Sequence, residues 1–336
     1  MIPAILARPP VAALADKGRR IMEVILHIGA QRTATTTLQH YLRANAQGLG
    51  DCGIGFWGPQ RTRNEGLLSG ILPEHGAPGA GQIDRARRRI AARFEAAARR
   101  GLSHLIVSDE NMLGTVRRNL RASALYPDAG ERLGHYAAAF DGAVSRVVLS
   151  LRGLDQYWAS AWAYAVGRGY RLPKPRELAA LAAQRRSWQA VVEDAAQAFP
   201  AVALQVHLHE RHAGLPERRL WHMVDGAVTP PLEQARAWLH RAPDLAELRL
   251  VLADRGEDPG LLPAGEGRWQ VFDTAQAAAL RETHADDLFW LQSGAGGLAT
   301  LIEEDLPDQA GENLPGGATT RGPKDDRNDG RLARTG

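Results

Sequence analysis

Short apolar runs alternate with amphipathic stretches along this chain. Four runs have the length and composition of buried strands: residues 24–28, 104–108, 145–151 and 202–208. They are followed by segments in which apolar positions recur every three or four residues, a spacing typical of a helix packed on one face. Strands that alternate with helices predict an α/β fold, in which a central parallel sheet is flanked by helices.

The segment 153–167 carries the clearest helical pattern. Its apolar side chains fall at positions i, i+3, i+4, i+7, i+8 and i+11: Leu154, Tyr157, Trp158, Ala161, Trp162 and Ala165. This spacing predicts a helix with a stripe that faces the core. Another helix is expected over 274–291, whereas the regions 50–82 and 168–176 contain Gly and Pro and are expected to be loops on the substrate side.

The same pattern delimits one domain over residues 22–305. Three prolines interrupt residues 1–21, and we expect this segment to be a disordered extension rather than a signal peptide, because it lacks a basic start. Met22, directly before the first strand, is an alternative start of the chain. Residues 306–336 are rich in Gly, Pro, Asp and Asn and are expected to be a disordered tail, since they offer little apolar surface to bury.

The first strand leads into a segment with the composition of a phosphate-binding loop. After Gly29 come one cation, Arg32, and the hydroxyls of Thr33, Thr35 and Thr36, placed where a helix is expected to begin. Backbone N–H groups at a helix start bind phosphate, and a nearby cation and hydroxyls support that binding. A strand–turn–helix unit without a ligand is the alternative, because threonine also caps helix starts.

This loop differs from that of the nucleotide triphosphatases, G-x-x-x-x-G-K-[ST]. Counted from Gly29, Ala34 stands at the second glycine and Thr35 stands at the lysine. Alanine lowers stability at position 34 if the backbone there needs a positive φ, and it is harmless if the residue is helical. The sequence leaves both alternatives open.

A second polar pair follows the strand at 145–151. Arg152 stands at the carboxyl end of this strand, and Ser160 lies eight residues later, about two turns into the next helix. Ligands of open α/β sheets bind beyond the carboxyl ends of the strands. Arginine can bind a phosphate through two parallel hydrogen bonds, and a serine hydroxyl can add a third. The alternatives are a surface salt bridge for Arg152 and a solvated position for Ser160.

Acidic residues follow the strand at 104–108 and are expected to reach the same edge of the sheet. Asp109 and Glu110 are candidates for a general base, which transfer of a group to a hydroxyl requires close to the attacking atom. His75, in a Gly- and Pro-rich region, is a weaker candidate. Alternatively, Ser108 or Asp109 caps a helix start, where acidic side chains are favoured.

Together these motifs resemble the sulfotransferases. Residues 29–36 resemble the 5′-phosphosulfate loop of that family, G-x-x-[KR]-[ST]-G-T-[TS], with Arg32 where most members have lysine and Ala34 in place of the usual glycine. Arg152 and Ser160 resemble the family's 3′-phosphate site. The resemblance covers roughly residues 22–210, and the flanking residues are similar to those of the bacterial branch, which sulfates carbohydrates and other small acceptors.

The resemblance implies a P-loop NTPase-like sulfotransferase fold. It also implies a co-substrate, 3′-phosphoadenosine 5′-phosphosulfate (PAPS), whose sulfuryl group passes to a hydroxyl or amine of a carbohydrate or other small acceptor without a metal. Arg32 and Glu110 are the implied catalytic residues. The implied donor-binding residues are Gly29, Arg32, Thr33, Ala34, Thr35, Thr36, Arg152 and Ser160. Glu210 is similar to a glutamate that braces the fold in this family, and 274–291 resembles the terminal helix of bacterial members.

Two other interpretations remain open. A P-loop kinase or related nucleotide phosphotransferase needs a loop lysine and an aspartate placed for Mg²⁺, and neither is evident in the sequence. A non-catalytic member that binds nucleotide or a partner protein is kept open by Arg32 and Ala34. The motifs specify neither the acceptor nor the oligomeric state.

Composition and charge narrow the range of partners. The formal net charge is only +3, so we interpret the arginine-rich segment 85–100 as the solvated face of a helix rather than a nucleic-acid site. Cys52 is the single cysteine, which suits the reducing cytosol, and no run of 18 apolar residues predicts a membrane span. We therefore expect a cytoplasmic protein without a nucleic-acid or membrane partner. His207, His209 and His212 are interpreted as a polar strand end rather than a metal site.

Overall fold

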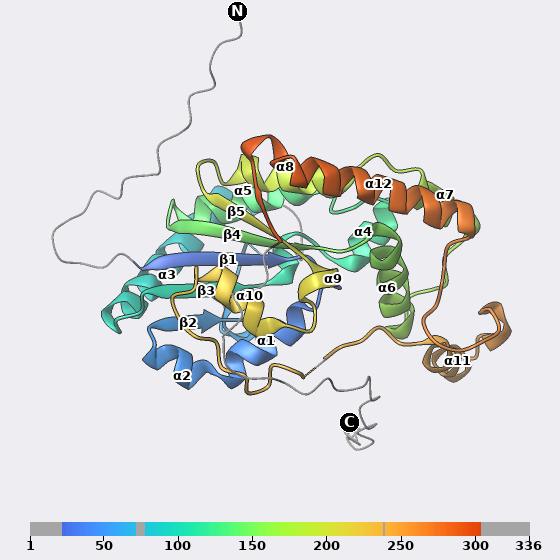
Figure 1. Ribbon diagram of the computed structural model, residues 1–336, viewed down its shortest axis with the longest axis horizontal. Coiled ribbons are helices and arrows are strands. Elements are labelled where there is room, and N and C mark those ends of the chain that lie inside the picture. Colours follow the sequence, from blue (N-terminus) through green and yellow to red (C-terminus); the bar gives the residue numbers. More distant parts are fainter. Residues whose placement is uncertain (1–21, 72–77, 238, 304–336) are drawn as a thin grey trace, which may run out of the picture. The chain divides into compact units, whose positions relative to one another are not determined.

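The computed structural model describes residues 22–71, 78–237 and 239–303. The expected tails at 1–21 and 306–336, and the candidate base His75, lie outside these residues. The described part of the chain forms one sheet of six parallel strands with helices on both faces, in the order β2-β3-β1-β4-β5-β6 (Figure 1). The α/β prediction is therefore confirmed.

The strands are β1 (Glu23–Gly29), β2 (Ile54–Trp57), β3 (His104–Ser108), β4 (Val144–Leu151), β5 (Ala203–Leu208) and β6 (Thr300–Ile302). The α-helices are α1 (Thr35–Ala44), α2 (Ala46–Asp51), α3 (Ala80–Arg99), α4 (Val116–Ala122), α5 (Ala129–Phe140), α6 (Leu154–Gly167), α7 (Pro175–Ala182), α8 (Trp188–Ala198), α9 (His209–His212), α10 (Pro216–Met223), α11 (Leu245–Asp254) and α12 (Thr274–Gln292). A π-helix, η1, spans Gln60–Asn64, and short 3-10 turns span Glu110–Met112 (η2), Pro259–Leu261 (η3) and Ala295–Gly297 (η4).

The four predicted strands correspond to β1, β3, β4 and β5, whereas β2 and β6 were missed. The expectation of a loop over 50–82 is wrong where β2 pairs with β3 and where η1 forms. A strand of four residues is too short for a periodic pattern, and its pairing depends on a distant partner. The expected loop 168–176 also ends early, because Pro175 fits the first position of α7, where no backbone donor is needed.

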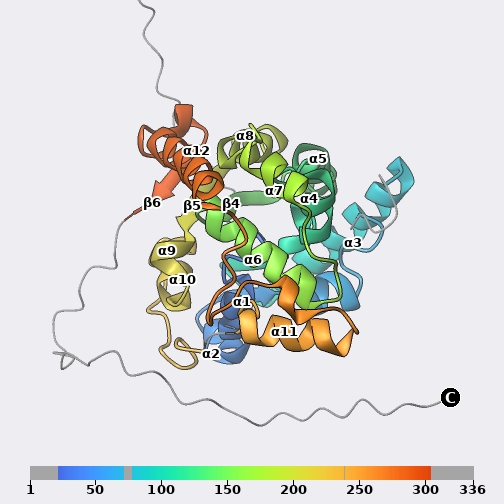
Figure 2. The ribbon, with the colours of Figure 1, turned by 90° about the vertical axis from the view of Figure 1, so that its right-hand side faces the viewer.

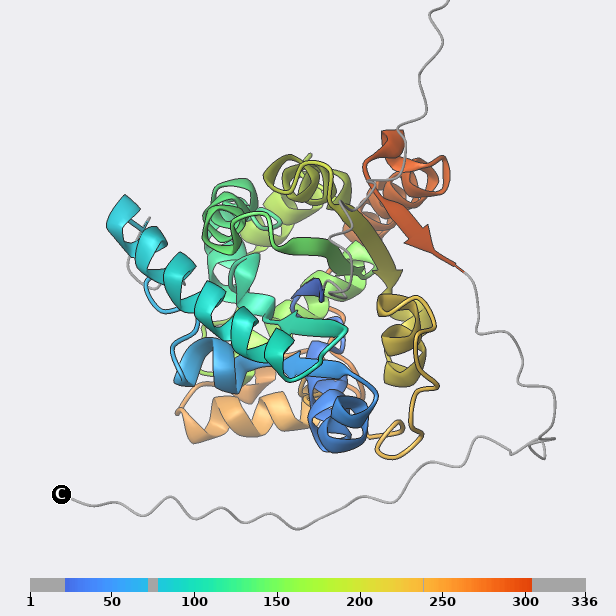
Figure 3. The ribbon, with the colours of Figure 1, turned by 90° about the vertical axis from the view of Figure 1, so that its left-hand side faces the viewer.

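Alternation along β1 divides the core into two clusters on opposite faces of the sheet. Ile25 packs with α1, α2 and α10, whereas Val24, Leu26 and Ile28 pack with α3, α5, α6 and α8. All six residues of the predicted stripe on α6 are buried in the second cluster. Figure 3, seen from the amino ends of the strands, shows β6 (red-orange) at the edge away from α3 (cyan). None of the helices in the described residues is both long and apolar enough to cross a membrane.

The order of the strands in the sheet determines where the candidate site lies. The chain moves from β1 to β2 and β3 on one side, and then crosses to β4 on the other side of β1. A crevice therefore opens at the carboxyl end of β1, which is the switch point where open α/β sheets bind their ligands. The loop that follows Gly29 lies in this crevice.

Candidate functional site

A cavity of about 1180 Å³ opens at the carboxyl edge of the sheet. Its walls come from the loop after β1, α1, η1, α6 and two later segments, 239–244 and 267–270. Figure 2 looks onto this edge, with α6 near the centre and α1 and α11 below it. Common small-molecule sites hold about 300–1,000 Å³. The cavity therefore has room for a nucleotide together with part of a second molecule.

The loop after β1 is shaped by its own hydroxyl groups. Thr33 Oγ1 donates to the carbonyl of Ala30 at 2.7 Å, and Thr35 Oγ1 donates to the same carbonyl at 2.9 Å. Thr35 and Thr36 line the cavity, whereas Thr33 is buried beneath the loop and does not. The expected contact of the Thr33 hydroxyl with a ligand is therefore not supported by its position, because that hydroxyl is used to close the loop.

Three backbone positions in this loop, Gly29, Arg32 and Ala34, have a positive φ, which favours glycine. Gly29 has φ of +100°, and a Cβ there would lie 3.1 Å from Glu110 Cβ, so the glycine lets the β1 and β3 ends approach each other. Gly29 itself supports the cavity without lining it. Ala34, at the N-cap of α1, has φ of 61° and ψ of 27°. Of the two alternatives for Ala34, the structure shows the strained one, a left-handed backbone with a Cβ.

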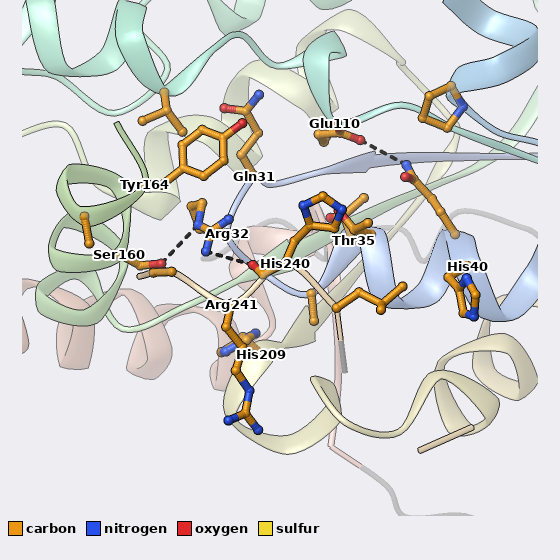
Figure 4. Close-up of a pocket in the computed structure, with 18 of the residues that line it drawn as sticks. Gln31, Arg32, Thr35, His40, Glu110, Ser160, Tyr164, His209, His240 and Arg241 are labelled. Atoms are coloured by element: carbon orange, nitrogen blue, oxygen red, sulfur yellow. Dashed lines mark hydrogen bonds between the residues drawn. The ribbon is translucent and has the colours of Figure 1, made fainter. Parts of the chain in front are cut away.

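Arg32 extends from the loop toward α6 rather than along α1. Its Nε donates to Ser160 Oγ at 3.1 Å, and a terminal nitrogen donates to the carbonyl of His240 at 3.2 Å (Figure 4). Its guanidinium carbon lies 4.7 Å from the centre of the Tyr164 ring, on which the cation is favourably placed. Burial lowers the pKa of Arg32 from its ordinary value. These contacts hold a cation in the cavity with neutral partners only.

Arg152, the residue directly after β4, lines the same cavity as Arg32. One of its terminal nitrogens donates to the carbonyl of Arg32 at 3.0 Å, and its buried Nε has no partner among the described residues. Burial, with further contributions from Arg268 and Arg32, lowers the pKa of Arg152 to about 10, so the side chain stays charged at neutral pH. Arg152 and Ser160 both line the cavity and are 9% and 8% exposed, which excludes the surface salt bridge and the solvated serine.

The turn between β4 and α6 is braced from behind. Trp188 Nε1 donates to the carbonyl of Arg152 at 2.8 Å, and the amide of Gly153 donates to Glu210 Oε1 at 2.9 Å. The Glu210 contact agrees with the bracing role that the resemblance implies. Asp287, on α12, accepts from Ser187 Oγ and from the amides of Trp188 and Gln189, and so fixes the start of α8 that carries the tryptophan.

Positive charge is concentrated in the cavity. Its lining includes four carboxylates: Glu65, Glu110, Asp244 and Glu247. It also includes eight arginines: Arg32, Arg43, Arg61, Arg63, Arg152, Arg168, Arg241 and Arg268. Glu65 pairs with Arg61, Glu110 pairs with Arg63, and the two carboxylates of α11 accept from backbone amides in its capping box. Within the described residues Arg32, Arg152, Arg168 and Arg268 form no ion pair. The cavity is therefore suited to a ligand with several negative charges.

The sequence did not single out Arg268 or Tyr164. Arg268 lines the cavity and is close enough to Arg152 to lower its pKa. It lies more than a hundred residues beyond β4 in an irregular segment, so no local pattern marks it. Tyr164 belongs to the predicted helix, but it lies off the stripe of core positions, and its ring contacts the guanidinium groups of both Arg32 and Arg168.

The two acidic candidates for a base have separate environments. Asp109 is fully buried, accepts from Thr62 Oγ1 at 2.5 Å and from Arg63, and caps the turn at Glu110–Met112 through the Asn111 amide. The helix-cap interpretation is therefore right for Asp109. Glu110 lines the cavity (Figure 4), and its Oε1 accepts from Arg63 at 2.9 Å while its Oε2 accepts from Gln39 at 3.0 Å. Of the two, only Glu110 can reach a molecule in the cavity.

Within the described residues, no group of three or more His, Cys, Asp or Glu side chains could hold a metal ion, and this includes the histidines at the end of β5 and in α9. His207 and His212 lie edge to face with ring centres 5.4 Å apart. His209 lines the cavity, and burial followed by the charge of Arg152 lowers its pKa to about 3, so this ring is neutral at physiological pH.

No family model, curated protein or solved structure matches this chain. The resemblance of the two motifs to sulfotransferases therefore stays a prediction, supported by where the structure places their residues. Arg32, Ala34, Thr35, Thr36, Arg152, Ser160 and Glu110 are brought together around one cavity, and Gly29 and Thr33 support it from beneath.

Replacing Ala34 with glycine is expected to stabilise the protein by about 1 kcal/mol, because a left-handed alanine costs about 1–2 kcal/mol and the extra freedom of glycine in the unfolded chain offsets part of this. Chemical denaturation measures the change. Ala201→Gly is a matched control, since Ala201 is exposed with φ of 64° and lies outside the cavity lining. Its stability should rise similarly. A loss of about 1 kcal/mol in Ala34→Gly, as for an alanine inside a regular helix, would show that residue 34 is not left-handed in solution.

Proposed function

We propose that this protein is a sulfotransferase that uses PAPS as donor, with the P-loop NTPase-like fold that such enzymes have. The observation that carries the proposal is the meeting of the two predicted motifs. Arg152 donates to the carbonyl of Arg32, and Arg32 donates to Ser160, so that one network joins residues 120 and 128 positions apart in the sequence. None of the cations in this network has a carboxylate partner in the described residues, which supports a polyanionic ligand.

The donor fits the chemistry of the cavity wall. Backbone N–H groups at the start of α1, with the hydroxyl of Thr36, are suited to the 5′-phosphosulfate, whereas the Thr35 hydroxyl, like that of Thr33, donates to the Ala30 carbonyl. Arg152 and Ser160 are suited to the 3′-phosphate, which distinguishes PAPS from ordinary adenylates. The unpartnered Nε of Arg152 is a buried donor that such a phosphate would satisfy. Arg268, close to Arg152, adds charge on the same side.

The proposed reaction uses this placement. The acceptor oxygen or nitrogen attacks sulfur, the bond between sulfur and the bridging oxygen to phosphorus breaks, and the electron pair leaves on adenosine 3′,5′-bisphosphate. The acceptor's proton passes to Glu110, the only acid of the two candidates that lines the cavity. Arg32 neutralises charge that grows on the bridging oxygen, an electrostatic contribution that is larger in a cavity with little water.

The cavity wall around Glu110 favours a polar acceptor. It is formed largely by amide and guanidinium side chains, namely Gln39, Gln60, Asn64, Arg61 and Arg63, with Phe56 and Pro59 as apolar contacts. Such groups bind hydroxyls through directed hydrogen bonds and leave little apolar area for a flat hydrophobic molecule. This composition supports a carbohydrate or similar polyhydroxylated acceptor.

Replacing Arg152 with alanine is expected to weaken binding of adenosine 3′,5′-bisphosphate about tenfold to a hundredfold, the range for losing hydrogen bonds to a charged group. Binding of AMP, which lacks the 3′-phosphate, should change little. Calorimetry measures both affinities, and Arg211→Ala is a matched control, since Arg211 is exposed and its one hydrogen bond within the described part of the chain is to the carbonyl of Glu303. An equal loss for both nucleotides would remove Arg152 from the 3′-phosphate site.

Replacing Arg32 with alanine is expected to lower kcat about a hundredfold or more, the scale of losing one donor that stabilises a transition state. The measurement is sulfuryl transfer from PAPS to an acceptor confirmed with the unchanged protein. Arg32→Lys keeps the charge and should recover part of the rate, although it loses the planar pair of donors. Unchanged turnover in Arg32→Ala would exclude the proposed role of this residue.

A further inference from the structure

Arg219, on α10, carries a charge that the proposed reaction does not use. The side chain is 2% exposed and lies beneath the loop that follows β1. One terminal nitrogen donates to Ser150 Oγ at 2.7 Å and to His27 Nε2 at 2.9 Å, and the other donates to the carbonyl of Thr33 at 3.4 Å. Residues of β1, β4 and the loop therefore meet at one guanidinium.

The partners of Arg219 are neutral. Burial, followed by the charge of Arg219, holds the pKa of His27 well below its ordinary value. Because the neutral ring accepts from Arg219 at Nε2, its Nδ1 carries the proton and donates to Ser108 Oγ at 2.8 Å. His207 is also buried, and burial followed by Arg219 lowers its pKa in the same direction. No carboxylate in the described residues forms an ion pair with Arg219.

Two other arginines with buried or half-buried contacts, Arg63 and Arg146, do have such partners. Arg63 bonds the buried Asp109, and Arg146 bonds Asp225, while Arg146 also donates to the carbonyl of Met223 at the end of α10. A buried cation without a counter-ion is costly, and burial lowers the pKa of Arg219 to about 10, which still leaves it charged at neutral pH. A charge kept under these conditions points to an anion that arrives from outside the chain.

The loop geometry shows how Arg219 can act on such an anion. The peptide bond between Thr33 and Ala34 is trans, so its carbonyl and its N–H point in opposite directions. By holding the Thr33 carbonyl inward, with His209 as a second partner of the Thr33 backbone, Arg219 helps turn the Ala34 N–H outward, and Ala34 lines the cavity. The buried positive charge and the outward-pointing N–H then both favour an anion on the cavity side of the loop.

We propose that Arg219 is a positioning residue for the 5′-anion of the ligand, and that this anion is its counter-ion across the loop. The proposal rests on the proposed function only in taking the loop as the seat of a phosphate or phosphosulfate. The role proposed for Arg219 differs from that of Arg152, because Arg219 does not line the cavity. Arg219 acts through the Thr33–Ala34 peptide group and through the electrostatic potential of its charge.

The test compares adenosine 3′,5′-bisphosphate with adenosine 3′-phosphate, which lacks only the 5′-phosphate. Arg219→Gln is expected to weaken bisphosphate binding about tenfold, since removing one charge in a medium of low dielectric constant has at least this effect at short range. Binding of the 3′-phosphate should stay within about twofold. Arg219→Lys keeps the charge and should hold the ratio of the two affinities within about threefold of the original. Arg146→Gln is the matched control and should leave this ratio unchanged.

Equal losses for both nucleotides in Arg219→Gln would show a purely structural role and overturn the proposal. If Arg219→Gln does not fold, a tenfold fall of the ratio in Arg219→Lys overturns the role of the charge. If the unchanged protein binds neither nucleotide, the proposed donor is wrong, and the variants are titrated with inorganic pyrophosphate. Arg219→Gln must then bind pyrophosphate about tenfold more weakly than the unchanged protein, and an absence of pyrophosphate binding to the unchanged protein also rejects the role of Arg219.

Discussion

The gathering, at the end of β1, of guanidinium groups that form no ion pair with any described residue is the constraint on which the rest of this structure depends. Like charges repel, and burial removes the water that would otherwise screen them. Arg32 and Arg152 are nevertheless held close together by carbonyls, a hydroxyl and the ring of Tyr164. Neutral partners fix the geometry of these side chains without cancelling their charge. This arrangement would suit the anionic ligand that the proposed function requires.

Hydrogen bonds behind the cavity hold the backbone around these arginines in place. Asp287 on α12 caps α8, Trp188 at the start of α8 holds the carbonyl of Arg152, and Glu210 holds the next amide. Beneath the loop, Arg219 joins β1, β4 and the Thr33 carbonyl. Three of these contacts, from Trp188, Glu210 and Arg219, restrain backbone groups in or next to a proposed ligand-binding residue. A site that acts by position and electrostatics requires such support, because small displacements weaken both.

Much of this arrangement could be predicted from local sequence patterns. The strands β1, β3, β4 and β5, the stripe on α6, and the placement of Arg152 and Ser160 on one cavity follow from periodicity and from the rule that parallel strands present their carboxyl ends together. The inward turn of the Thr33 hydroxyl could not be predicted, since it depends on the backbone conformation of the loop. Arg219 and Arg268 reach the site from distant segments, and contacts of that kind leave no periodic signal.

The central claim is that the cavity recognises an adenosine compound with phosphate groups at both its 3′ and 5′ positions and needs no divalent metal to do so. Calorimetric titration of the unchanged protein with adenosine 3′,5′-bisphosphate, AMP and ATP, each with and without Mg²⁺, measures this most directly. We expect the bisphosphate to bind at least about tenfold more tightly than AMP, consistent with one additional charged hydrogen-bonded group, and to do so equally with and without Mg²⁺. Equal affinity for the bisphosphate and AMP, or ATP binding that depends on Mg²⁺, would contradict the account.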